Sequence, residues 1–169
     1  MLVNNAAYTS NGPILQVPWG RWQKAMRVQV AAPLQLVQGF VPGMLDRGAG
    51  RVVNISSGAA ADLSPGLSLY GVSKLSMERL TQYLHAELGG RGVSFNAMHI
   101  DRPVSTETWH LVVDRQGAEL GLTSESRELM SPSLVARQVE WMVGQPAGWS
   151  GHVIGLDEIE AQGGPRDAA

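Results

Sequence analysis

The sequence has 169 residues, of which 44% are hydrophobic, and its formal net charge at pH 7 is −2. A chain of this size can bury one core of ordinary size, so it forms one domain or part of one. The low charge argues against a nucleic-acid partner, and the absence of cysteine excludes disulfides and thiolate metal sites.

No apolar run approaches the roughly 18 residues that a membrane-spanning helix needs. Residues 1–5 have neither the basic start nor the apolar stretch of a signal peptide. We therefore expect a cytoplasmic protein that acts on a small molecule, with no membrane and no nucleic acid among its partners.

Strand and helix patterns alternate along the chain, which predicts an α/β sheet with crossover helices. Pro33 and Pro42 are expected to kink or break the first helix. Residues 106–130 are polar and irregular, as is typical of a helical lid over a pocket. The domain is expected to span residues 1–162, followed by a disordered tail at 163–169. The expected strands are 2–3, 51–55, 93–98 and 152–156, and the expected helices are about 19–45, 69–88 and one starting at 131–133.

A serine, a tyrosine and a lysine form the most informative spacing in the chain. Ser57 ends an apolar strand, and Tyr70 and Lys74 are one helical turn apart on one face of the predicted helix. A neighbouring ammonium group lowers the pKa of a phenol, which makes Tyr70 a usable acid or base. Ser57 could donate a hydrogen bond to a substrate oxygen that gains charge in the transition state.

Other interpretations of these residues are weaker. Taken alone, Tyr70 and Lys74 would be an ordinary surface pair, but Ser57 and the motifs around it make that interpretation improbable. A serine hydrolase is disfavoured because the chain lacks a Gly-x-Ser-x-Gly elbow. The four histidines lack metal-ligand spacing, so no metal site is expected. His99 and Asp101 are interpreted as a loop variant, with tuning of the site as the alternative.

The ordered set of motifs resembles the carboxy-terminal two-thirds of a short-chain dehydrogenase/reductase. The family has an Asn-Asn-Ala-Gly strand end, an Asn-Ile-Ser-Ser strand end, a Tyr-x-x-x-Lys helix and a Pro-Gly turn after the next strand. Here these correspond to residues 4–7, 54–57, 70–74 and the segment from Asn96 to Thr106. The resemblance implies a partial Rossmann-like doubly wound parallel sheet, with strands 4–7 of the usual seven and flanking helices.

The resemblance also implies hydride exchange between NAD or NADP and an alcohol or carbonyl carbon. Tyr70 would exchange a proton with the substrate oxygen, Ser57 would orient that oxygen, and Lys74 would hold the nicotinamide ribose and depress the tyrosine pKa. Asn4 and Ala6 would line the cofactor cleft, and Val104 and Thr106 keep a Val-x-Thr pattern found near the carboxamide and phosphate. A family member is also expected to form a homodimer or homotetramer when full-length.

Three departures from the family pattern stand out. Gln29 occupies the position of an asparagine that holds a proton-relay water, and it keeps the amide with one more methylene; it could equally be a polar residue satisfied within a helix. The segment His99-Ile100-Asp101-Arg102 replaces the Pro-Gly turn ahead of Pro103, and Ala7 replaces the glycine of the first motif.

The Thr-Gly-x-x-x-Gly-x-Gly loop and the first three strands of the family have no counterpart in this sequence. We therefore expect a truncated oxidoreductase sequence. The alternative is a non-catalytic half-domain that binds no cofactor and serves as an interaction or dimerisation partner through the helix at 69–88.

Overall fold

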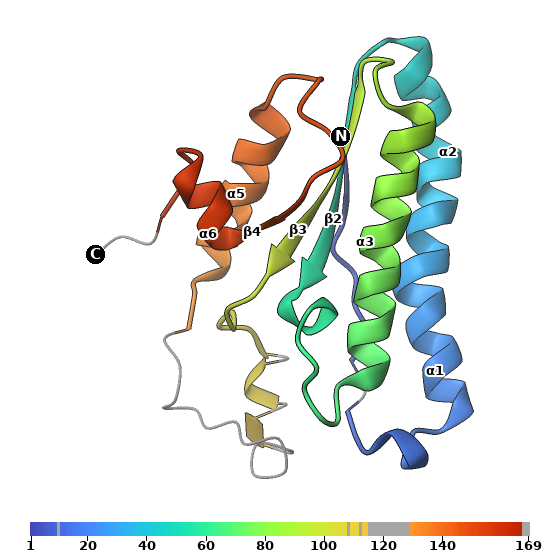
Figure 1. Ribbon diagram of the computed structural model, residues 1–169, viewed down its shortest axis with the longest axis vertical. Coiled ribbons are helices and arrows are strands. Elements are labelled where there is room, and N and C mark those ends of the chain that lie inside the picture. Colours follow the sequence, from blue (N-terminus) through green and yellow to red (C-terminus); the bar gives the residue numbers. More distant parts are fainter. Residues whose placement is uncertain (10, 108, 112, 115–128, 167–169) are drawn as a thin grey trace.

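The computed structural model describes residues 1–9, 11–107, 109–111, 113–114 and 129–166. Within these residues, four parallel strands form one sheet in the order β1-β2-β3-β4 (Figure 1). Parallel neighbours that follow chain order require crossover connections, as the alternating pattern predicts. The prediction of an α/β parallel sheet is therefore confirmed. The strands are β1 (Leu2–Asn4), β2 (Gly50–Ser57), β3 (Val93–Ile100) and β4 (Val153–Gly155).

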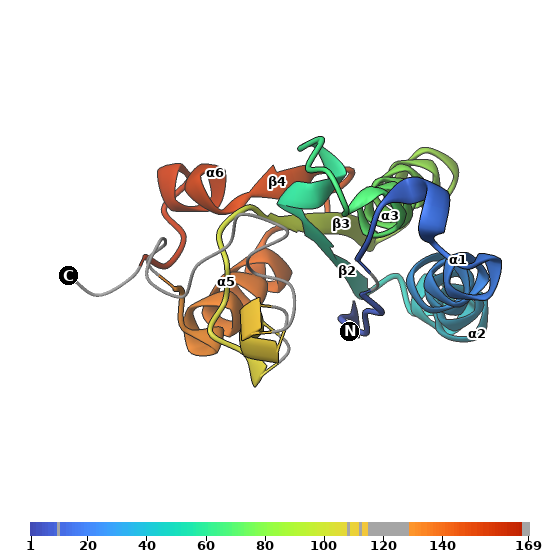
Figure 2. The ribbon, with the colours of Figure 1, turned by 90° about the horizontal axis from the view of Figure 1, so that it is seen from below.

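Helices cover both faces of the sheet (Figure 2). The first helical region and α3 pack on one face, and α5 packs on the other. A short helix, α6, follows β4 directly and was not predicted from the sequence. The helices are α1 (Trp19–Met26), α2 (Ala32–Asp46), α3 (Ser68–Leu88), α5 (Pro132–Gly144) and α6 (Leu156–Ala161), with 3₁₀ turns at Ile14–Gln16 and Gly58–Ala60.

The first helical region is continuous but changes its hydrogen-bond pattern before Pro33. A π-helical turn at Arg27–Ala31 joins α1 to α2, and the Ala32 N–H donates to the Arg27 carbonyl. Pro33 has no N–H to donate to the carbonyl four residues earlier, so a wider turn there is a reasonable local solution. The expected irregularity therefore occurs at Pro33, whereas α2 continues through Pro42.

Both faces of the sheet are buried, as is usual for parallel sheets. Val52 and Phe95 point toward α2 and α3, whereas Val53 and Met98 of the same two strands point toward α5. Side chains alternate along a strand, so each strand contributes to two separate cores. One consequence is that consecutive residues at the end of β2 enter different environments.

The expectation that no stretch reaches membrane-spanning length needs a correction. By length and composition alone, the 28-residue stretch Trp19–Asp46 is long and apolar enough to cross a bilayer. In the fold, Val37, Val41 and Met44 of this stretch pack against the sheet. Core burial thus accounts for these three side chains, whereas only 28% of the apolar window is buried within the fold.

The carboxy-terminal end continues beyond α6. Gly164 is buried and donates to the Ile159 carbonyl at 2.8 Å, and the Pro165 carbonyl accepts from Gln138 Nε2 at 3.2 Å. Residues 167–169 lie outside the described residues. The division of the chain at residue 162 stays a prediction.

Candidate active site

The predicted site residues gather at the carboxyl ends of the first two strands. Asn4 is the last residue of β1, Ser57 is the last residue of β2, and Tyr70 and Lys74 lie in the first two turns of α3. The 3₁₀ turn after β2 and the loop behind it return the chain to the start of α3. In open α/β sheets this edge is where ligands bind.

Tyr70 and Lys74 lie together on the inner side of α3. The Lys74 Nζ is 5.6 Å from the centroid of the Tyr70 ring. The Ser57 side chain lies close enough to Tyr70 to lower the tyrosine pKa, and its hydroxyl accepts from the Ala59 N–H at 3.3 Å. The structure thus brings together the serine, tyrosine and lysine that the spacing singled out.

The sequence predicts that Lys74 lowers the pKa of Tyr70, and this prediction is wrong for this structure. Burial raises the pKa of Tyr70 above its ordinary value, and only the Ser57 side chain lowers it. Desolvation disfavours the charged phenolate and outweighs the serine hydroxyl. Tyr70 is therefore a neutral phenol near pH 7, suited to donating a proton.

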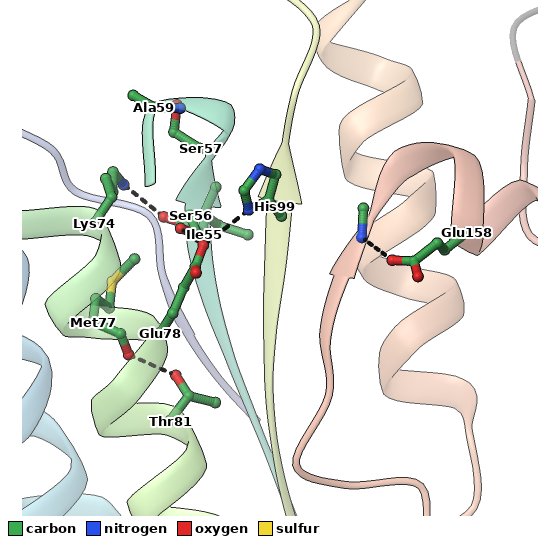
Figure 3. A network of polar contacts seen from close by, with 11 residues as sticks. Ile55, Ser56, Ser57, Ala59, Lys74, Met77, Glu78, Thr81, His99 and Glu158 are labelled. Atoms are coloured by element: carbon green, nitrogen blue, oxygen red, sulfur yellow. Dashed lines mark hydrogen bonds and ion pairs between the residues drawn. The ribbon is translucent and has the colours of Figure 1, made fainter. Parts of the chain in front are cut away.

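Lys74 is almost fully buried, with 2% of its surface exposed. Its Nζ donates to the Ile55 carbonyl of β2 at 2.6 Å (Figure 3). Burial lowers the pKa of Lys74 to about 8, and the negative charge of Glu78 opposes that fall. A buried ammonium group without a direct ion pair is costly, so its surroundings decide whether it keeps its proton.

A chain of side-chain hydrogen bonds supports the site from below. Asn4 Nδ2 donates to Asn54 Oδ1 at 2.7 Å, Asn54 Nδ2 donates to Thr81 Oγ1 at 2.7 Å, and the Thr81 hydroxyl donates to the Met77 carbonyl at 2.9 Å. The chain joins β1, β2 and α3 and fixes the side chain of Asn4. The Asn4 Oδ1 is buried and has no partner among the described residues.

The other predicted cofactor-binding residues lie in loops. Ala6 is exposed just after β1. Val104 forms a parallel bridge with Met130 and packs against the α5 core. Thr106 is exposed, and its hydroxyl accepts from the Trp109 N–H at 3.2 Å. Most of the predicted lid, residues 108, 112 and 115–128, lies outside the described residues.

Gln29 lies in the π-helical turn and is fully buried. Its Oε1 accepts from the Tyr8 N–H at 2.8 Å, and its Nε2 donates to the Ser73 hydroxyl. Ser73 in turn donates to the Tyr70 carbonyl at 2.8 Å. Both ends of the amide are therefore used to join the segment after β1 to the start of α3.

A second polar cluster beside the site was not predicted. It consists of Ser56 of β2, Glu78 of α3 and His99 of β3 (Figure 3). Glu78 Oε1 accepts from the Ser56 hydroxyl and lies 3.0 Å from His99 Nδ1. Helical spacing in the sequence could have pointed to Glu78, because this residue follows Lys74 by four residues and Tyr70 by eight and therefore lies on the same side of the helix.

The structure also has a cavity of about 300 Å³ at the carboxyl ends of β3 and β4, beyond His99. Its other lining residues are Asp101, Val153, Gly155, Asp157 and Glu158. In the part of the chain that the structure describes, no group of three or more histidine, aspartate or glutamate side chains is arranged to hold a metal ion.

The fold and the site together define an α/β protein with a Ser-Tyr-Lys group at the carboxyl edge of a parallel sheet. A family model described as short chain dehydrogenase matches residues 1–116. The chain therefore belongs to the short-chain dehydrogenase/reductase family, whose members are oxidoreductases that act on alcohol or carbonyl substrates. This confirms the resemblance seen in the motifs.

Three known proteins illustrate the similarity. The chain is 40% identical over 99 residues to human dehydrogenase/reductase SDR family member 4, covering 58% of this chain and 36% of that protein. It is 30% identical over 153 residues to the 2-(R)-hydroxypropyl-CoM dehydrogenase of Xanthobacter autotrophicus, covering 87% and 60%. A blue fluorescent protein from a metagenomic library, solved with NADPH, has 28% identity and a TM-score of 0.78, covering 93% and 63%. The chain thus spans less than two thirds of each.

Proposed function

We propose that this chain carries the catalytic side of an NAD(P)-dependent oxidoreductase that interconverts an alcohol and a carbonyl. The observation that carries the proposal is the meeting of Ser57, Tyr70 and Lys74 at the carboxyl edge of the sheet, with Ser57 beside Tyr70 and the Lys74 Nζ 5.6 Å from the centroid of the tyrosine ring. Family membership and the NADPH-bound relative support it.

The residues present fit the nicotinamide end of such a cofactor. The buried Asn4 Oδ1 lacks a partner among the described residues, although its amide nitrogen is held by Asn54. Ala6 is exposed at the same edge, and Lys74 uses one Nζ donor on Ile55. Asn4, Ala6 and Lys74 would therefore hold the cofactor, with Val104 and Thr106 on its carboxamide side. When bound, NAD(P) supplies or accepts the hydride.

The protein side chains handle the proton. Tyr70, kept neutral by burial, donates its phenolic proton to the substrate oxygen when a carbonyl is reduced, and it takes the proton back in the reverse direction. The Ser57 hydroxyl donates to the same oxygen as charge develops there. Gln29 fixes the start of α3 through Ser73, so its proposed part in catalysis is to hold Tyr70 in place.

Replacement of Tyr70 by phenylalanine tests this function. Without the acidic proton, turnover of NAD(P)H with a carbonyl substrate should fall by about 10²- to 10⁴-fold. Tyr83→Phe is the matched control, because Tyr83 lies exposed on the same helix. Unchanged turnover in Tyr70→Phe, with Tyr83→Phe equally active, would contradict the catalytic assignment.

We also propose that this sequence is part of a longer protein. The relatives extend well beyond the matched region, and this chain has no Gly-rich loop to hold the cofactor phosphates. Translating the coding sequence ahead of Met1 tests the idea, and an in-frame stop codon directly upstream would contradict it. The longer product should bind NAD(P)H more tightly than the 169-residue chain.

The cytoplasmic location stays a prediction.

Pairing of two copies through α2 and α3 is proposed as the oligomeric state. These adjacent helices expose large apolar side chains, namely Leu36 (41%), Phe40 (57%), Val72 (43%) and Leu75 (50%). Such a patch is typical of a protein interface. Analytical sedimentation should show that the wild-type protein is a dimer and that the Phe40→Glu variant is a monomer. A monomeric wild-type protein would rule out this pairing. A dimer without measurable cofactor binding would instead favour the non-catalytic alternative.

A further inference from the structure

Glu78 is the only buried carboxylate in the described part of the chain, with 8% of its surface exposed. It lies one turn beyond Lys74 on α3 and reaches toward β2 (Figure 3). A carboxylate is rarely buried unless it is paired and hydrogen-bonded. Its position next to the proposed active site therefore calls for a function of its own.

The contact of Glu78 with β2 is made at the strand end that carries the proposed site. Its Oε1 accepts from Ser56, which lies between Ile55, the acceptor of the Lys74 Nζ, and Ser57, the proposed hydroxyl donor. By holding Ser56, Glu78 fixes the end of β2 on which both neighbours depend. A shift of this segment would move the Lys74 acceptor and the serine together.

Glu78 also acts on Lys74 through its charge. No carboxylate in the described residues is within 4.0 Å of the Lys74 Nζ, yet the negative charge of Glu78 opposes the fall of the lysine pKa. The other titratable group facing Lys74 is Tyr70, whose ring lies 5.6 Å from the Nζ. Glu78 is thus the nearby group that favours the charged ammonium form.

His99 connects this carboxylate to the cavity at the ends of β3 and β4, because it both contacts Glu78 and lines that cavity. Its hydrogen bond to Glu78 is the largest cause of its raised pKa, and Asp101 and Asp62 contribute. A protonated His99 neutralises the carboxylate, whereas a neutral His99 leaves the full negative charge acting on Lys74.

We propose that Glu78, held by Ser56 and His99, is a positioning residue that keeps the Lys74 ammonium group charged and in place, with the protonation of His99 setting the strength of this support. The inference rests on the proposed function only for the use of Lys74 in cofactor binding. The contacts themselves are properties of the folded chain.

The experiment measures the pKa of Lys74 and of His99 by NMR in protein labelled with ¹³C and ¹⁵N at lysine and histidine. The sequence has only two lysines, so Lys74 and the exposed Lys24 give an assignable pair of signals. In Glu78→Gln the Lys74 pKa should fall below about 8, and the His99 pKa should fall toward its ordinary value. Lys24 should not change.

Two variants separate charge from packing. Glu78→Asp keeps the carboxylate and should return the Lys74 pKa most of the way to the wild-type value, whereas a packing role predicts no such difference between the Asp and Gln variants. Glu87→Gln removes an exposed carboxylate from the same helix and should leave both pKa values unchanged. If the pKa values of Lys74 and His99 in Glu78→Gln are the same as in the wild-type protein, the proposal is overturned.

If Glu78→Gln does not fold, the wild-type protein still decides the question. The Lys74 signals should then show a second, smaller titration step at the pKa of His99, and a curve with a single step would overturn the proposal. These measurements need neither cofactor nor substrate. They can therefore fail while Tyr70→Phe still abolishes turnover, or succeed in a protein that has no oxidoreductase activity.

Discussion

At the carboxyl ends of β2 and β3, the two faces of the sheet bury different chemistry, although both faces carry an apolar core further along the strands. Toward α5, the ends of β2 and β3 present Ile55 and Met98, which belong to an apolar core. Toward α3, the neighbouring residues Ser56 and His99 meet Glu78 in a polar cluster. The proposed site depends on this asymmetry, because a buried polar group must find partners and therefore fixes the geometry around it.

At these strand ends, the apolar side chains toward α5 supply stability, whereas the polar side chains toward α3 supply chemistry at some cost in stability. An apolar core gains free energy from each buried methylene group. A buried ammonium group such as Lys74 loses hydration that its partners only partly replace. Removing an apolar side chain from the α5 face and removing the Lys74 charge from the α3 face should therefore have effects of opposite sign.

The largest effect is expected from the apolar face. Leu134 of α5 is fully buried in the core against β2 and β3. Leu134→Ala should lower the free energy of unfolding by about 2–5 kcal/mol, because it removes buried surface and leaves a cavity. Urea denaturation measures the change. Leu63→Ala, at a site 99% exposed, should change it by less than about 0.5 kcal/mol, and equal losses in both variants would contradict this account of the core.

On the α3 face, Lys74→Met should stabilise the protein. The folded state lowers the Lys74 pKa to about 8 from 10.5, so between these pH values the unfolded state binds more protons and wild-type stability rises with pH. Below pH 8 the penalty is complete, at about 3 kcal/mol. The variant should be more stable at pH 7 and should lack the alkaline rise.

The control for this prediction is Lys24→Met, which changes an exposed lysine that lies 4.5 Å from the Tyr8 ring. It should alter stability by less than about 1 kcal/mol and keep the alkaline rise. Denaturation curves recorded from pH 6 to about pH 10, across the titration range of lysine, provide the comparison. A loss of stability in Lys74→Met at pH 7 would mean that its bond to Ile55 outweighs the cost of burial.

The smallest effect is expected from the hydrogen-bond chain below the site. Thr81→Val keeps the shape of the side chain but removes the acceptor of Asn54 Nδ2, which leaves a buried amide unpaired. The expected loss is about 1–3 kcal/mol. Thr81→Ser keeps the hydroxyl and should lose less. If thermal or urea unfolding shows the two variants to be equal, the hydroxyl contributes nothing and only packing matters.

The sequence by itself determined the order of the four strands and of the helices before α6, the family, and the placement of Ser57, Tyr70 and Lys74 at one edge of the sheet. The order of the elements follows from local periodicity, and the meeting of the three side chains follows from the rule that parallel strands end at a common edge. The family follows from the resemblance of the ordered motifs. The start of α5 was also predictable, because Ser131 accepts from the Leu134 N–H as a helix cap.

Only the tertiary structure decided the electrostatics and the partners of those residues. The spacing of Tyr70 and Lys74 predicted a lowered tyrosine pKa, but burial reverses the direction. Likewise, Glu78 and His99 lie 21 residues apart, and their contact depends on how α3 packs across β2 and β3. Desolvation and long-range contacts depend on the whole packed core, so a pattern of neighbouring residues cannot report them.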